Sequence, residues 1–229
     1  MTMKNVVITG AGSGLGASLA RKYSEMGYHV TLIGRTKEKL ERTAKLLKGS
    51  YSIYELDVSK YDDVKKVFHS IIEEVGGVDI LINNAGVGAF DLAENISEHN
   101  VHQMIDINLK GTIFCTQAVL PHMKERNEGI ISNIISTAGV EGKVTESVYC
   151  ASKFGVRGFT DSLYLELKDT PIRVFAAYMG GMKTDFWDGI YKEEEMTHLM
   201  DPDDVADIII NNMKLRKNLS VKEVIIKNK

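Results

Sequence analysis

The chain has 229 residues, a formal net charge of −3 at pH 7, 44% hydrophobic residues and 26% charged residues. This length is enough for one domain, residues 1–229, and the composition excludes a disordered or fibrous protein. No basic excess points to nucleic acid, and two cysteines exclude a disulfide framework. No apolar run reaches the roughly 20 residues of a membrane span, and no signal peptide precedes the first apolar run. We therefore expect a cytoplasmic protein without nucleic-acid or membrane partners.

Short β-branched runs alternate along the chain with longer amphipathic runs. Strands are expected at 4–9, 29–34, 51–56, 78–82, 129–136, 171–178 and 221–226. Helices are expected near 14–27, 36–48, 60–75, 98–124, 148–168 and 202–214. This alternation predicts an α/β protein with a doubly wound Rossmann-type fold, in which helices cover both faces of a seven-stranded, mostly parallel sheet. Residues 186–200, here called the lid segment, are expected to form a mobile lid over the carboxyl ends of the strands, where ligands bind.

The first expected strand ends in a glycine-rich turn that leads into a helix. Glycines let the backbone approach a ligand closely, and the helix N-terminus offers free N–H groups and a positive dipole end to a pyrophosphate. The turn therefore predicts a dinucleotide site, although a purely structural tight turn is the alternative. The expected contacts are Gly10, Gly12, Ser13, Gly14, Leu15 and Gly16.

The second expected strand ends at Gly34-Arg35-Thr36, with no acidic residue before Glu38. A carboxylate at this place would hold the ribose hydroxyls of NAD and repel a 2′-phosphate. The guanidinium of Arg35 attracts that phosphate instead. We therefore expect NADP(H) to be preferred over NAD(H). The alternative is that Arg35 is a surface arginine at a helix start.

Tyrosine and lysine recur at i, i+4 spacing, which places both on one helix face. Three such pairs exist, where about one is expected by chance: Tyr61–Lys65, Tyr149–Lys153 and Tyr164–Lys168. Only Tyr149 opens a helix shortly after a strand end that carries a hydroxyl, that of Ser136. Asn108 lies upstream, in the helix that follows the fourth strand.

In their order and spacing, these motifs resemble the short-chain dehydrogenase/reductase family, in its compact single-domain branch. The motifs are T-G-x-x-x-G-x-G at 9–16, Asp57-Val58 after the third strand, N-N-A-G at 83–86, Asn108, Ser136 and Y-x-x-x-K at 149–153. The resemblance covers nearly the whole chain. It implies an NAD(P)-dependent oxidoreductase that interconverts a carbonyl and a secondary alcohol on a small or medium molecule.

The resemblance also implies roles for single residues. Tyr149 would be the general acid and base. Lys153 would shift the pKa of that tyrosine toward neutrality and hold the nicotinamide ribose. Ser136 would orient the substrate oxygen, and Asn108 would position a water in a proton relay. The resemblance places further cofactor contacts at Asp57, Val58, Asn84, Ala85 and Gly86.

The loop after the sixth strand departs from the family's pattern. The family has a Pro-Gly pair there, followed by a threonine that contacts the nicotinamide, whereas this chain has Met179 in place of the proline. Proline would stiffen this turn, so we expect a looser loop. Gly180, Met182 and Thr184 are still expected to contact the cofactor.

Several charged and aromatic residues near the expected site allow two interpretations. Phe186 and Trp187 either wall a substrate pocket or anchor the lid segment. Lys143 and Glu146 would border the pocket, although exposed loop charges are the simpler interpretation. His99 and His102 share a helix face without a third ligand at suitable spacing, so no metal site is expected.

The long helices at 98–124 and 148–168 carry apolar residues that are expected to face outward, namely Phe114, Phe159 and Leu163. Such helices pair between subunits in the family, which implies a homodimer or homotetramer. A small carbonyl or alcohol is the expected ligand besides the cofactor. The alternative function is a catalytically silent NADP(H)-binding sensor or interaction module.

Overall fold

A computed structural model describes residues 3–190 and 192–229 of the chain. Its seven strands form one sheet in the order β3-β2-β1-β4-β5-β6-β7, and every neighbouring pair is parallel. The strands are β1 (Asn5–Thr9), β2 (His29–Gly34), β3 (Tyr51–Glu55), β4 (Ile80–Asn83), β5 (Ile130–Ile134), β6 (Arg173–Met179) and β7 (Glu223–Ile226). The expected doubly wound sheet is confirmed.

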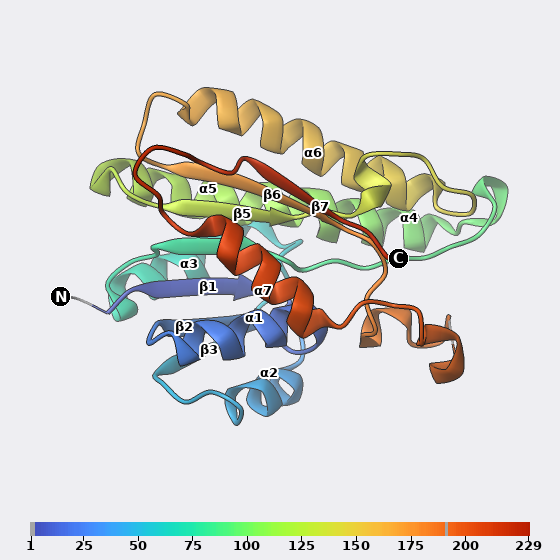
Figure 1. Ribbon diagram of the computed structural model, residues 1–229, viewed down its shortest axis with the longest axis horizontal. Helices are drawn as coiled ribbons and strands as arrows, with labels where there is room; N and C mark the ends of the chain where they lie inside the picture. Colours follow the sequence, from blue (N-terminus) through green and yellow to red (C-terminus); the bar gives the residue numbers. More distant parts are fainter. Residues whose placement is uncertain (1–2, 191) are drawn as a thin grey trace.

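Helices cover both faces of this sheet, and α7 crosses one face in Figure 1. One face carries α1 (Gly14–Glu25), α2 (Lys37–Ala44) and α7 (Pro202–Met213), and the other carries α3 (Tyr61–Val75), α5 (Gly111–Arg126) and α6 (Ser147–Leu167). Successive strand residues feed the two cores in turn, because strand side chains alternate between faces. In β1, Val6 and Ile8 enter one core and Val7 enters the other. Both faces are therefore buried, which explains the continuous apolar runs in the sequence.

The single helix expected at 98–124 is divided in the structure. It consists of α4 (Glu98–Met104), a π-helical turn (Ile105–Lys110) and α5. Short 3-10 turns also occur at Ala93–Asn95, Thr137–Gly139, Asp185–Trp187 and Glu193–Met196. The π turn contains Asn108, so the irregularity falls on a predicted site residue.

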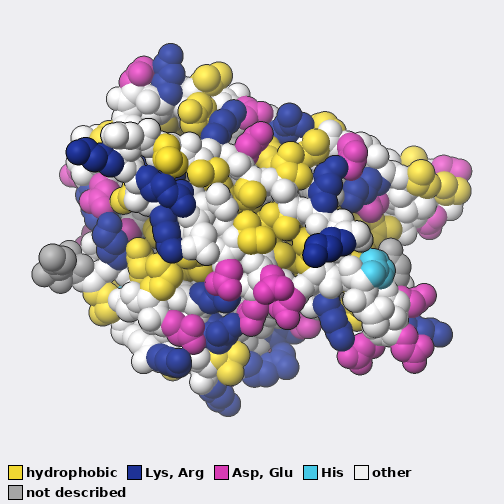
Figure 2. Space-filling view, viewed as in Figure 1, with side chains coloured by type: hydrophobic (Ala, Val, Ile, Leu, Met, Phe, Trp, Pro, Cys, Tyr) yellow, Lys and Arg dark blue, Asp and Glu magenta, His cyan; other side chains and the backbone are white. Residues whose placement is uncertain are grey.

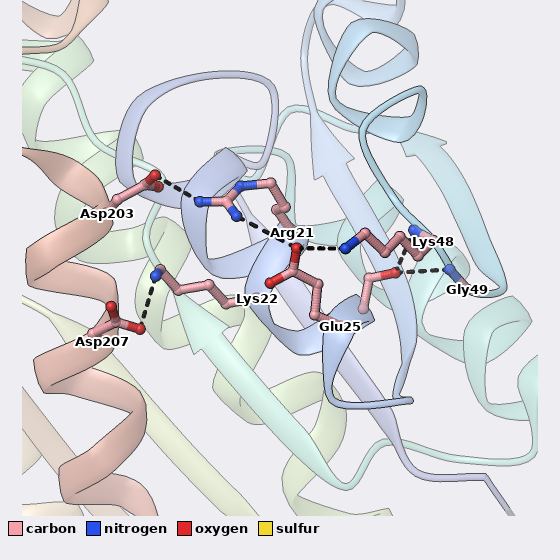
Figure 3. A network of polar contacts seen from close by, with 8 residues as sticks. Arg21, Lys22, Glu25, Lys48, Gly49, Asp203 and Asp207 are labelled. Carbon is pink, nitrogen blue, oxygen red and sulfur yellow. Dashed lines mark hydrogen bonds and ion pairs between the residues drawn. The ribbon is translucent and has the colours of Figure 1, made fainter.

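Ion pairs join α7 to α1 on the outside of the sheet (Figure 3). The Arg21 guanidinium lies 2.6 Å from the Asp203 carboxylate, and the Lys22 ammonium lies 2.8 Å from that of Asp207. These side chains are partly exposed, so each pair contributes at most about 1 kcal/mol to stability. Their effect is to orient α7, which begins directly after the lid segment.

The packing of α5 and α6 corrects one expectation about outward-facing apolar residues. Leu163 was expected to face outward, but it is 3% exposed and belongs to the core under α6. Phe114 and Phe159 are only partly buried. Acidic and basic side chains are interspersed on the face shown in Figure 2. Within the described ranges, no helix combines the length and apolar character that a membrane crossing requires.

Candidate functional site

The glycine turn after β1 is held by the segment that follows β4. The side-chain amide of Asn84 donates hydrogen bonds to the carbonyl oxygens of Thr9 (3.0 Å) and Gly10 (3.2 Å). The Thr9 hydroxyl oxygen accepts from the main-chain N–H groups of Asn84 and Ala85, both at 3.0 Å. Two motifs that are far apart in sequence thus form one rigid unit at the carboxyl end of the sheet.

The glycines of this turn are needed for different geometric reasons. Gly10 and Gly14 have positive φ angles of 65° and 50°, which side chains rarely tolerate. A Cβ on Gly16 would collide with the carbonyl oxygen of Gly10, so this glycine allows α1 to pack close to the turn. A Cβ on Gly12 would lie 2.9 Å from the Cβ of Lys39 on α2.

A cavity of about 440 Å³ opens at the carboxyl ends of the strands. Most of the predicted site residues line it: Gly10, Ser13, Gly14, Leu15, Arg35, Asn84, Ala85, Gly86, Ser136, Tyr149, Lys153, Gly180, Met182 and Thr184. The sheet order separates the ends of β2 and β5 by three strand spacings. The cavity is therefore elongated across the sheet edge, with Arg35 and Ser136 at well-separated places.

Five predicted residues do not line the cavity. Gly12 and Gly16 shape the glycine turn as described above, and Asn108 is considered below. The Asp57 carboxylate accepts hydrogen bonds from the main chain (3.0 Å) and hydroxyl (2.8 Å) of Ser59. Val58 packs so closely on Gly111 that a Cβ there would lie 2.6 Å from its Cγ2. In this structure Asp57 and Val58 organise the turn after β3.

Ser136, Tyr149 and Lys153 come together at one part of the cavity. Tyr149 and Lys153 lie one turn apart on α6, and the Lys153 ammonium is 5.7 Å from the Tyr149 ring centroid. The same ammonium donates a hydrogen bond to the carbonyl oxygen of Ile134 (3.2 Å), at the end of β5. Ser136 follows this strand end and shares a hydrogen bond with the Tyr149 hydroxyl.

Burial dominates the proton affinities of this group. It lowers the pKa of Lys153 from 10.5 to about 8. Burial also raises the pKa of Tyr149 above its ordinary value, an effect that the Ser136 hydrogen bond opposes and the Glu146 charge reinforces. The expected lowering of this pKa toward neutrality is not seen in this structure, where burial has the largest effect. The Tyr149 hydroxyl keeps its proton at neutral pH and is ready to donate it.

Asn108 lies behind the cavity wall, in the π turn. Its amide nitrogen donates to the carbonyl of Val87 (2.9 Å) and to the Ser152 hydroxyl (3.0 Å), and its amide oxygen accepts from the Val87 N–H (2.8 Å). Its main-chain carbonyl accepts from the Thr112 hydroxyl (2.8 Å). The side chain therefore fixes the loop after β4 against α6. π turns are often found at functional sites.

An aromatic cluster covers the tyrosine. Phe186 and Trp187 line the cavity, and their rings lie 5.1 Å apart. Phe186 is 6.0 Å from the Tyr149 ring, and Phe90 contacts both Tyr149 (5.5 Å) and Trp187 (5.5 Å). The indole N–H of Trp187 donates to the carbonyl of Met182 (3.0 Å). The two aromatic residues thus wall the pocket and anchor the lid segment at once.

Sequence reasoning missed several lining residues: Lys39, Val87, Gly88, Ile134, Ile135, Met179, Gly181 and Asp185. Lys39 stands in the first turn of α2, four residues after Arg35, so its closeness in sequence to the candidate phosphate-binding arginine could have identified it. It forms a 3.4 Å ion pair with Asp185 across the cavity mouth. Asp185 carries no comparable sequence signal, because its position depends on the path of the loop between β6 and the lid segment.

The residues present fit a dinucleotide phosphate. Helix α1 starts at the glycine turn, and its first turn contains no acidic side chain. The side chain of its N-cap, Ser13, makes no capping hydrogen bond. Its N–H groups and positive dipole end are therefore available to a pyrophosphate. Arg35 and Lys39 supply cations for a further phosphate, and Gly86 brings the backbone close to Lys153, where a Cβ would lie 3.6 Å from the ammonium.

Comparisons with known proteins extend over almost the entire chain. The sequence model of the protein family described as short chain dehydrogenase matches residues 4–195. An uncharacterized oxidoreductase of Staphylococcus epidermidis is 31% identical over 227 residues, which cover 98% of this chain and 96% of that protein.

Solved structures are equally similar. The alcohol dehydrogenase of the archaeon Thermococcus sibiricus, complexed with 5-hydroxy-NADP, gives a TM-score of 0.89 at 28% identity, covering 97% of this chain and 95% of its own. The closed form of a serine dehydrogenase complexed with NADP+ gives a TM-score of 0.89 at 31% identity, covering 96% and 93%.

Proposed function

The chain belongs to the short-chain dehydrogenase family and is an NAD(P)-dependent oxidoreductase, and from this premise we propose that it interconverts a carbonyl and a secondary alcohol on a small or medium molecule, with NADP(H) as the preferred cofactor. The observation that carries the proposal is the meeting of Ser136, Tyr149 and Lys153 in one cavity with the glycine turn. We assign the whole chain, residues 1–229, to one catalytic domain that acts in the cytoplasm.

Each residue of the trio has a distinct task in carbonyl reduction. Tyr149 donates its proton to the substrate oxygen, in keeping with a pKa that burial raises. Ser136 donates a hydrogen bond to the same oxygen and orients it. The Lys153 ammonium, with a pKa near 8, is largely charged at neutral pH and stabilises the phenolate that Tyr149 leaves behind. The bound nicotinamide supplies the hydride.

Other predicted positions support this chemistry. The glycine turn and Asn84, Ala85 and Gly86 hold the pyrophosphate and ribose side of the cofactor. Gly180, Met182 and Thr184 contact its nicotinamide end, and Asp57 and Val58 shape the adenine side. We retain the proton-relay role of Asn108 as part of the proposal, with its side chain fixing the position of the π turn.

Replacing the tyrosine tests the assigned acid. Tyr149→Phe removes one oxygen atom and the transferable proton, so we expect turnover of carbonyl substrates to fall at least about a hundredfold. NADPH binding, measured by fluorescence titration, is expected to persist. Tyr164→Phe is the matched control, because Tyr164 lies on the same helix with a lysine four residues later and does not line the cavity.

The outcomes of these measurements distinguish the proposed oxidoreductase from a catalytically silent NADP(H)-binding sensor. Full activity in Tyr149→Phe would refute its role as acid. Tight NADPH binding by the wild-type protein, with no turnover across a broad panel of carbonyls, would favour the silent sensor. Absence of cofactor binding would contradict both.

The NADP(H) preference is tested at the end of β2. Arg35 is exposed and lines the cavity, as does Lys39 in the first turn of α2. Arg35→Asp places a carboxylate where the 2′-phosphate is expected, so the NADPH-to-NADH affinity ratio should fall at least about tenfold. Arg42→Asp, at the exposed far end of α2, makes the same charge change away from the cavity and should leave the ratio unchanged. An unchanged ratio in Arg35→Asp would remove Arg35 from cofactor recognition.

A further inference from the structure

Residues 180–184, here called the nicotinamide loop after the role proposed above, follow β6 and form one wall of the cavity. The lining residues of this loop are Gly180, Gly181, Met182 and Thr184. The loop also touches the glycine turn, because a Cβ on Gly14 would lie 2.9 Å from the Cγ2 of Thr184. The position of this loop therefore determines how the nicotinamide end of the cavity fits onto its pyrophosphate end.

Main-chain hydrogen bonds join the nicotinamide loop to two neighbouring segments. The N–H of Gly180 donates to the carbonyl of Ile226 on β7 (2.9 Å). At the end of the lid segment, the N–H of Met200 donates to the carbonyl of Gly181 (3.1 Å), and its carbonyl accepts from the N–H of Lys183 (2.9 Å). The loop thus lies between β7 and the end of the lid segment.

One side chain joins all three of these segments. Asn228, two residues after β7, is partly buried, and its amide nitrogen donates to the carbonyl oxygens of Gly181 (3.0 Å) and His198 (3.2 Å). Its amide oxygen lies so close to Gly180 that a Cβ there would collide with it. Both hydrogen-bond partners are acceptors, so only a side chain with two donor hydrogens can make the same junction.

The nicotinamide loop depends on such contacts for its order. Its first two residues are glycines, and glycine loses more conformational freedom than any other residue when it is fixed. Among the residues that the structure describes, Trp187 and Asn228 donate side-chain hydrogen bonds to carbonyls of this loop. Of the two, Asn228 also holds the end of the lid segment.

The junction is connected to the catalytic tyrosine through the aromatic cluster. The indole N–H of Trp187 donates to the carbonyl of Met182, the residue after Gly181 (3.0 Å). The Trp187 ring stacks on Phe90 with 5.5 Å between centroids, and Phe90 lies 5.5 Å from the Tyr149 ring. A shift of the loop at Gly181 would therefore move the aromatic wall of the pocket together with the nicotinamide end.

We infer that Asn228 is a positioning residue for hydride transfer, which holds the nicotinamide loop and the end of the lid segment in the arrangement that the reaction requires. The inference rests on the proposed function. Asn228 does not line the cavity, and the glycine turn and Arg35 hold the phosphates of the cofactor without it. Loss of its hydrogen bonds should therefore lower kcat more than it weakens NADPH binding.

Two substitutions separate the hydrogen bonds of Asn228 from its shape. Asn228→Ala removes the side chain, whereas Asn228→Asp keeps its shape but turns a carboxylate oxygen toward the two carbonyls, which repel it. With NADPH and diacetyl, we expect kcat to fall at least about tenfold in the aspartate variant and less in the alanine variant, while the Kd for NADPH changes less than about threefold, because small misplacements of reacting groups are costly.

Hydrogen exchange followed by mass spectrometry tests the junction without turnover. In both variants, peptides that cover residues 180–184 and 198–200 should exchange faster than in the wild type, whereas peptides of the glycine turn should not change. Asn218→Asp is the matched control, because it makes the same chemical change at an exposed asparagine before β7, away from the cavity. It should leave kcat, Kd and exchange unchanged.

Several results would overturn the inference. Unchanged kcat and exchange in both variants would show that Asn228 does not hold the loop. Wild-type kcat in Asn228→Asp with a loss in Asn228→Ala would show that the residue only fills space. Equal losses of kcat and NADPH affinity would place its effect on cofactor binding. If the wild type reduces neither diacetyl nor any other carbonyl, the proposed function fails, and the exchange measurement still decides whether Asn228 holds the loop.

Discussion

Lys153 shows how one residue serves the site at the expense of stability. Its side chain is 5% exposed, and a single main-chain carbonyl, that of Ile134, accepts a hydrogen bond from its ammonium. Burial disfavours the charged form and lowers its pKa from 10.5 to about 8. At about 1.4 kcal/mol per pH unit, this corresponds to roughly 3 kcal/mol of folding free energy lost at neutral pH.

The sign of this effect gives a pH-dependent prediction. The folded-state pKa lies below the unfolded value, so the cost is fully present below about pH 8 and is relieved as the pH rises from about 8 to 10.5. Lys153→Met should therefore melt at a higher temperature than the wild type at pH 7. The difference between the two melting temperatures should narrow as the pH rises from about 8 to 10.5. Thermal unfolding at pH 7, 9 and 10.5 checks this, with the exposed Lys37→Met as control. A difference in melting temperature that does not change with pH would show that burial does not destabilise the charged ammonium.

The sequence identifies residues whose role depends on local spacing. The positive φ angles of Gly10 and Gly14 and the one-turn spacing of Tyr149 and Lys153 are properties of short segments. Asp185 could not be assigned in the same way, and Glu146 could be placed at the pocket only as one of two interpretations. Their proximity to the cavity depends on how a loop and the lid segment fold back over the sheet edge.

At the scale of elements, the π turn is the feature that periodicity could not reveal. The apolar pattern at 98–124 fits one helix, and α4 and α5 do follow it. The wider turn between them coincides with the three hydrogen bonds that join the Asn108 side chain to Val87 and Ser152. Such long-range polar contacts produce no periodic pattern in the sequence.

The lid segment is attached to the body at both of its ends. Met182 and Met200 form a parallel bridge, and the Asn228 side chain donates to the carbonyls of Gly181 (3.0 Å) and His198 (3.2 Å). Asp185, directly before the segment, forms an ion pair with Lys39 and so adds a contact to α2. The ends of the segment are thus fixed, and a ligand that binds Lys39 would compete with Asp185 for it.

The Lys39–Asp185 pair gives a prediction about this element. Both side chains are about half exposed, so the pair contributes less than about 1 kcal/mol to stability. Lys39→Met should leave the melting temperature nearly unchanged but weaken NADPH binding about fivefold, because a cation for the 2′-phosphate is lost. NADH binding should not change, and parallel titrations with both cofactors make the comparison. A large loss of thermal stability, or equal weakening of both cofactors, would contradict this assignment.

For the whole molecule, the strand order and the two-layered covering follow from simple rules. Buried parallel strands joined by right-handed helical crossovers leave few arrangements, and the observed order is one of them. Val6 and Ile8 enter one core and Val7 enters the other, and the burial of all three could be anticipated from the continuous apolar run. Which helix faces are exposed could not be anticipated from the sequence, and the burial of Leu163 is an example.

The outer face of α6 supports a prediction about assembly. Phe154 and Leu165 are 42% and 64% exposed, and their spacing corresponds to about three helical turns, so they share one face. Gly158 lies near the same face, and a Cβ there would meet no atom within 4 Å, which permits close approach of another helix. We propose a homodimer or homotetramer that uses this face. Light scattering should show an oligomer that Phe154→Asp dissociates, whereas Leu46→Asp, exposed after α2, leaves it intact. A monomeric wild type would refute the proposal.

The aromatic cluster over Tyr149 also contains an intrinsic fluorescent probe of the site. The chain contains one tryptophan, Trp187, and its indole lines the cavity beside Phe186. Light absorbed selectively by tryptophan therefore reports on this site and on no other part of the chain. A reduced nicotinamide absorbs where indole emits, so its arrival should quench the emission by energy transfer. Binding, lid position and substrate entry can all be followed in the unlabelled wild-type protein.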